Sequence, residues 1–191
     1  IYDYNGSFVN VDTPSIKRSV KALSDCLTEH KMKSDGNRIW CEACNTVHEM
    51  DTLGRLKNLN GETKFSHIPD WFEWQREQVR NEIVNHQYNV ELNVIIESLP
   101  NSSGFYRLDN GTLKHSEDGF VLENPDFKIE KTVLSNYGVH IEYDYFGKGD
   151  CIDLSTHQDT YYIYPLNKKN VVTKLHFAVE EIYKIKHDLL Q

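Results

Sequence analysis

The chain has 191 residues, a formal net charge of −8 and 39% hydrophobic residues. This composition predicts a folded chain with a core of its own. The acidic balance argues against general nucleic-acid binding, which depends on neutralising phosphates. No apolar run approaches the roughly 20 residues that span a bilayer. Four cysteines are too few for a disulfide framework in a chain of this length, which predicts a cytoplasmic location.

The first 25 residues are expected to form a helical segment. Ile1-Tyr2-Asp3-Tyr4 opens the chain without a methionine, which indicates a cut inside a longer protein. Further along, Asp12-Thr13-Pro14 is typical of a helix start, with Thr13 as the N-cap and Pro14 at the first helical position. We therefore expect residues 1–25 to be an N-terminal helix segment.

Three cysteines crowd into the next stretch, with the spacing of a zinc ribbon that lacks one ligand. Cys41-Glu42-Ala43-Cys44 is a complete C-x2-C knuckle, whereas Cys26 would pair with position 23, which holds Leu23. His30, four residues after Cys26, completes a Cys3His set, and His48 lies the same distance beyond Cys44. The alternative is that zinc has been lost and the cysteines are ordinary buried thiols. The predicted cofactor is zinc, and the predicted ligands are Cys26, His30, Cys41 and Cys44.

A ribbon-like segment over residues 26–66 precedes a connecting amphipathic helix over residues 67–88. In the ribbon, the turn Ser34-Asp35-Gly36-Asn37 separates two short extended runs. In the helix, Asp70 caps the first turn and Glu73 completes a capping box. The aromatic start of this helix, Trp71, Phe72 and Trp74, is expected to pack into the core, because nearby carboxylates oppose insertion into anionic lipid.

Residues 89–191 are expected to form a β-rich domain closed by a helix. From Asn89 the hydrophobic pattern alternates, and Asn110-Gly111 and Asp118-Gly119 predict tight hairpin turns. A regular apolar stripe then predicts a final helix from about Val171 to Leu189. Six or seven strands closed by one helix is the order of pleckstrin-homology-like barrels. The predicted fold class is therefore α+β: a zinc-ribbon-like segment and a helix, followed by a pleckstrin-homology-like barrel.

No catalytic constellation stands out in the chain. His30 and Asp35 match the H-x4-D pattern of glycerolipid acyltransferases, but we interpret this match as coincidence, since it falls in the ribbon turn. Cys151 and His157 offer a thiol near an imidazole, yet neighbours in a strand alternate between faces. Cys151 is therefore expected to be a packed strand residue.

Several local strings resemble one family. They are the helix start His67-Ile68-Pro69-Asp70-Trp71-Phe72-Glu73-Trp74 and the strand pair over residues 140–155, with similar strings at 111–120 and 159–165. Over most of residues 26–185 the chain resembles the long C-terminal extension of bacterial 1-acyl-sn-glycerol-3-phosphate acyltransferase-like proteins. In that family an H-x4-D acyltransferase domain precedes a cysteine ribbon, such a helix and a β-rich end.

The resemblance implies a non-catalytic accessory region. The acyl chemistry would belong to the upstream acyltransferase domain, and no catalytic residue carries over. Ribbon ligands carry over only at Cys26, Cys41 and Cys44. The implied partners are the upstream domain, membrane lipid or acyl-carrier protein, and the implied location is cytoplasmic, peripheral on the inner face of the membrane. The alternatives are a stand-alone acyl-transfer or hydrolase enzyme using Cys151 and His157, and a plain protein-interaction module.

Overall fold

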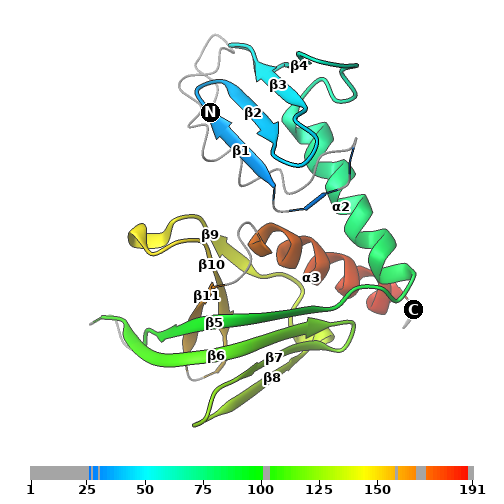
Figure 1. Cartoon of the computed structure of the whole chain (residues 1–191). Coiled ribbons are helices and arrows are strands. Elements are labelled where there is room, and N and C mark those ends of the chain that lie inside the picture. Colours follow the sequence, from blue (N-terminus) through cyan, green and yellow to red (C-terminus); the bar gives the residue numbers. More distant parts are fainter. Residues whose placement is uncertain are drawn as a thin grey trace. The chain divides into compact units, whose positions relative to one another are not determined.

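The computed structural model is an α+β protein that divides into two compact units, residues 1–77 and 78–191 (Figure 1). It describes residues 26, 28–29, 31–100, 104–157, 159–166 and 171–188. The N-terminal helix expected over residues 1–25 lies outside these described residues. The boundary between the units falls inside helix α2 (Ile68–Val84), whose first turns therefore belong to unit 1 and whose last turns belong to unit 2.

Unit 1 is built on a four-stranded antiparallel sheet in which each strand pairs with the next along the chain. The turn expected at Ser34–Asn37 is confirmed: it joins the first two strands, and Gly36 supplies the left-handed φ of 54° that this turn needs. The strands are β1 (Met32–Asp35), β2 (Arg38–Cys41), β3 (Val47–Met50) and β4 (Leu56–Asn58).

The core of unit 1 is small. Trp71, in the first turns of α2, is 1% exposed and packs beside the rings of Phe65 and His48, with ring centroids 5.9 and 5.0 Å away. The expectation that the aromatic start of this helix enters the core is therefore confirmed. Six of the described residues form the buried cluster: Met32, Ile39, Cys41, Met50, Leu56 and Trp71.

Unit 2 is a seven-stranded antiparallel sheet in the order β8-β7-β6-β5-β11-β10-β9, curled into a half-barrel (Figure 1). Two meanders build it, and β5 joins them by pairing with β11. The 3-10 turns η1 (Val133–Ser135) and η2 (Tyr145–Gly147) lie in the connections around β9. The strands are β5 (Val90–Ser98), β6 (Tyr106–Ser116), β7 (Gly119–Glu123), β8 (Lys128–Thr132), β9 (His140–Glu142), β10 (Cys151–Ser155) and β11 (Thr160–Pro165).

Helix α3 (Val171–Asp188) confirms the helix expected near the end of the chain. Its apolar stripe is buried in unit 2, and Leu175 and Ala178 are fully inaccessible. Two ion pairs tie it to the last turns of α2: Arg80 Nη1 lies 2.9 Å from Glu181 Oε2, and Lys174 Nζ lies 2.6 Å from Glu82 Oε2. Glu181 is only 3% exposed, and its carboxylate is compensated by Arg80 and by Lys184, whose Nζ lies 2.7 Å from Glu181 Oε1.

The two expected hairpin turns have different outcomes. Asp118-Gly119 does lie at the β6–β7 turn. The turn expected at Asn110-Gly111 is wrong, because both residues lie inside β6. Gly111 is needed there for close packing: a Cβ at this position would lie 2.5 Å from the Glu123 carbonyl oxygen and 2.7 Å from Ile96 Cδ1.

Replacing Gly119 by alanine should lower the free energy of unfolding of unit 2 by about 3 kcal/mol, because its φ of 118° is unfavourable for a side chain. The added Cβ would also lie 2.0 Å from the Lys131 carbonyl oxygen. Gly138→Ala is the matched control, since a Cβ at that position meets nothing within 4 Å. Urea unfolding, followed by circular dichroism, measures the free energy of unfolding of each variant. Equal free energies for Gly119→Ala and Gly138→Ala would contradict the requirement for glycine at position 119.

A buried histidine lies in the half-barrel. His115 is 2% exposed, its Nδ1 lies 2.8 Å from the Tyr88 hydroxyl, and its ring stacks on Phe120 at 4.0 Å. Burial lowers the pKa of His115 to about 3, because the charged imidazolium would lose its hydration. The folded protein therefore keeps this ring neutral at every pH near neutrality.

Unit 2 should lose stability as the pH falls from 6.5 towards 3, because the unfolded chain protonates His115 in this range and the folded chain does not. The expected loss due to this residue is about 3 kcal/mol between pH 6.5 and pH 4. His115→Gln keeps a hydrogen-bonding group that does not titrate, so the variant should show a shallower decline. Urea unfolding at several pH values tests this, and the same pH slope in both proteins would refute it.

Candidate metal centre

Three thiols of unit 1 converge at one point. The sulfur atoms of Cys26, Cys41 and Cys44 all lie within 4.8 Å of one another, and the Sγ atoms of Cys26 and Cys41 are 3.7 Å apart. Tetrahedral zinc with Zn–S bonds of about 2.3 Å separates its sulfur ligands by about 3.8 Å. The spacing of the thiols therefore fits three corners of a zinc tetrahedron, and soft thiolates suit this ion.

The turn after β2 has a conformation that favours thiolate ligands. The Asn45 N–H donates to the Cys41 carbonyl at 2.9 Å, which closes a tight turn, and Asn45 takes the left-handed φ of 58° that asparagine tolerates. Inside this turn the Ala43 N–H donates to Cys41 Sγ at 3.4 Å. Such a backbone donor stabilises negative charge on sulfur. The spacing of Cys41 and Cys44 indicated the knuckle, but a backbone donor leaves no sequence signal.

The electrostatic surroundings of the thiols differ. Burial alone would raise the pKa of the Cys26 thiol, but hydrogen bonds from Thr28, and then from Cys44 and Cys41, outweigh it and hold this pKa below its usual value. Burial raises the pKa of the Cys41 thiol, against the backbone donors of Cys44 and Ala43. The Thr46 hydroxyl lies 3.3 Å from Cys44 Sγ. Sequence reasoning missed both threonines, because they are not ligands themselves.

The structure brings together three of the four predicted ligands. His30 lies outside the described residues, as does Leu23, so neither position is placed relative to the thiols. His48 belongs to the packing around Trp71, at 5.0 Å between ring centroids. Among the residues described, the three thiols are the one group of potential ligand atoms close enough to share an ion.

The other candidate pair is not assembled into a site. Cys151 begins β10 and is 0% exposed, and its pKa is raised to about 12, first by burial and then by Asp153. His157 is exposed and lies beyond the opposite end of the strand, so about 13 Å of extended chain separates Cys151 from the residue where β10 ends. A buried thiol with a raised pKa and no imidazole assembled beside it is a poor nucleophile.

Comparison with known proteins assigns the chain to no family. No protein-family model matches it, and no curated protein matches it. Among the described residues, neither helix combines the length and apolar character needed to cross a membrane. The geometry and chemistry of the three cysteines therefore carry the evidence for this site.

We expect the purified chain to bind one zinc ion per molecule, and each of Cys26→Ser, Cys41→Ser and Cys44→Ser to reduce that binding at least about tenfold. Cobalt substitution checks the ligand type, because thiolate ligands give charge-transfer absorption in the near ultraviolet. Cys151→Ser is the control and should leave metal content unchanged. Full metal content in Cys41→Ser would contradict a thiolate site.

Proposed function

We propose that this chain is a non-catalytic accessory region in which a structural zinc ion holds unit 1 together as a zinc ribbon, while unit 2 binds a partner. The observation that carries the proposal is the convergence of Cys26, Cys41 and Cys44 beside a core of six buried residues. A core of this size contributes little stability by itself. Zinc binding to such a site adds folding free energy directly, because the unfolded chain has no preformed site.

For unit 2 we propose a pleckstrin-homology-like fold. The support is the number and order of its elements: seven antiparallel strands in two meanders, followed by one buried C-terminal helix. This is an argument from architecture, and architecture alone does not specify a ligand.

The family resemblance leads to a more specific proposal. The chain would be the accessory extension of a glycerolipid acyltransferase-like protein, with the acyl chemistry in an upstream domain. Unit 2 would then position that domain by binding membrane lipid or acyl-carrier protein, in the cytoplasm and at the inner face of the membrane. The described residues are compatible with this role, since the candidate metal site consists of thiols and contains no assembled nucleophile and base.

Two other functions have less support. A stand-alone acyl-transfer or hydrolase enzyme would need Cys151 and His157 close together, whereas they lie at opposite ends of β10. A large exposed aromatic patch around Trp71 would support a plain protein-interaction module, but Trp71 is 1% exposed.

The proposal is tested by titrating the zinc-loaded chain with vesicles of anionic phospholipid and, separately, with acyl-carrier protein. We expect saturable binding to one of them, and no release of free thiol from acyl-CoA. Binding to neither would overturn the partner role and leave a structural role only. Turnover of acyl-CoA that disappears in Cys151→Ser would instead favour the enzyme.

A further inference from the structure

One face of the unit 2 sheet carries a row of polar side chains that crosses four strands. Asp153 on β10 lies opposite Tyr162 on β11, which lies opposite Glu97 on β5, and Glu97 lies opposite Arg107 on β6. Side chains two residues apart in a strand point to the same face. Cys151 and Tyr164 therefore belong to this face too, beside Asp153 and Tyr162.

Three polar groups of this face are buried. Cys151 is 0% exposed, Tyr164 is 5% exposed and Glu97 is 8% exposed. The Tyr164 hydroxyl is inaccessible, and its polar neighbours are Cys151 and Glu97. Its pKa is raised, first by burial and then by the neighbouring Cys151 and Glu97. A thiol, a hydroxyl and a carboxylate thus lie together on this face.

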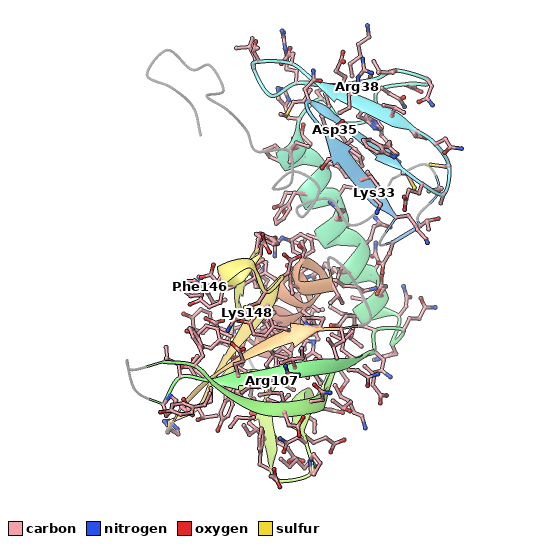
Figure 2. All side chains as sticks on the ribbon, turned by 60° about the vertical axis from the view of Figure 1, so that its left-hand side comes forward. Lys33, Asp35, Arg38, Arg107, Phe146 and Lys148 are labelled. Atoms are coloured by element: carbon pink, nitrogen blue, oxygen red, sulfur yellow. The ribbon has the colours of Figure 1, made fainter. Side chains whose placement is uncertain are left out.

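The connection between β9 and β10 packs on part of this face, and we name its residues 143–150 the clasp. The Tyr145 ring stacks on Tyr162, with centroids 5.3 Å apart and an interplanar angle of 5°. Lys148 Nζ donates to both carboxylate oxygens of Glu97, at 2.7 and 2.9 Å, and lies 5.0 Å from the centre of the Phe105 ring. Figure 2 labels Lys148 and Phe146 on this connection. It also labels Arg107 on β6, the strand that pairs with β5.

The backbone of the clasp is strained. Asp144 and Phe146 hold left-handed φ values of 51° and 50°, which cost free energy in residues other than glycine. Gly147 and Gly149, on either side of Lys148, have φ values of 73° and 116°. The Phe146 ring is 75% exposed, so its burial contributes little to the closed form. Lys148 and the stacked Tyr145 hold the clasp on the sheet. The Tyr143 hydroxyl, 3.1 Å from Thr173 Oγ1, holds its first residue.

We propose that the clasp closes over Cys151, and that its opening makes Cys151 a modification site for small disulfides. In the open form the Cys151 thiol gives its proton to a neighbouring carboxylate or to water, and its sulfur attacks one sulfur of the disulfide. A mixed disulfide forms, the second sulfur leaves as a thiolate, and that thiolate takes up the proton. The two electrons of the broken S–S bond leave with this group, so no further oxidant is needed.

The inference goes beyond the proposed function and does not depend on the metal centre, because all of its groups lie in unit 2. The proposal also gives a reason for the buried polar groups of this face, which apolar packing does not require. A buried carboxylate paired with one exposed lysine, beside a buried hydroxyl and a buried thiol, is a costly way to fill a sheet face.

The test uses the full zinc-loaded chain and the small disulfide 4,4′-dithiodipyridine, with modification of the Cys151 peptide followed by mass spectrometry. Lys148→Met should speed this modification at least about tenfold, because it removes the ion pair that holds the clasp. Lys114→Met is the matched control: Lys114 pairs with Glu123 at 3.4 Å on the exposed surface, and its loss should leave the rate within about twofold.

Gly149→Ala provides a second variant that keeps every charge. A Cβ at Gly149 meets nothing within 4 Å, so the substitution acts through its φ of 116° and should also speed modification. Gly36→Ala, at a φ of 54° in unit 1 and equally open, is its control. Unchanged rates in both clasp variants would overturn the proposal. So would a urea dependence of the wild-type rate as steep as that of global unfolding, because local opening exposes little surface.

Discussion

Unit 1 depends on the charge and spacing of three sulfur atoms. Thiolates within 4.8 Å of one another repel strongly unless protons or a cation neutralise them. The sheet of unit 1 forces this proximity, because the turn after β2 returns the chain at Cys44 while Cys41 is fully buried in the core. The same turn directs a backbone N–H at Cys41 Sγ. A divalent cation would neutralise the thiolates and join the segment at Cys26 to the turn after β2.

Unit 2 also contains negative charge in poorly hydrated positions, and lysine and arginine side chains neutralise it. Two glutamates are buried among the described residues of unit 2, and each has a basic partner: Glu181 of α3 pairs with Arg80 and Lys184, and Glu97 of β5 pairs with Lys148. Removing a partner from such a pair leaves an uncompensated charge in a poorly hydrated site. The first arrangement joins the two helices of the unit, and the second holds the clasp on the sheet.

The four cysteines lie in two different environments. The two partly accessible thiols, Cys26 and Cys44, lie in the cluster with Cys41, where metal binding would occupy them. The remaining thiol, Cys151, has a pKa raised to about 12, which keeps it protonated and inert while the clasp is closed. A thiol in this state can still respond to an opening of the segment above it. The chain thus combines a fixed thiol cluster in one unit with a covered thiol in the other.

The sequence by itself determined the features that depend on local periodicity and spacing: the aromatic helix start, the final helix, the Asp118-Gly119 turn and the Cys41–Cys44 knuckle. It misplaced Asn110-Gly111, because the close approach of Glu123 and Ile96 requires Gly111 within a strand. The predicted grouping of Cys26 with this knuckle is confirmed, since its Sγ lies 3.7 Å from Cys41 Sγ. Only the tertiary structure decided that Glu97, Lys148, Tyr164 and Cys151 meet. These contacts join residues far apart in the chain, and strand pairing, which local patterns do not encode, brings them together.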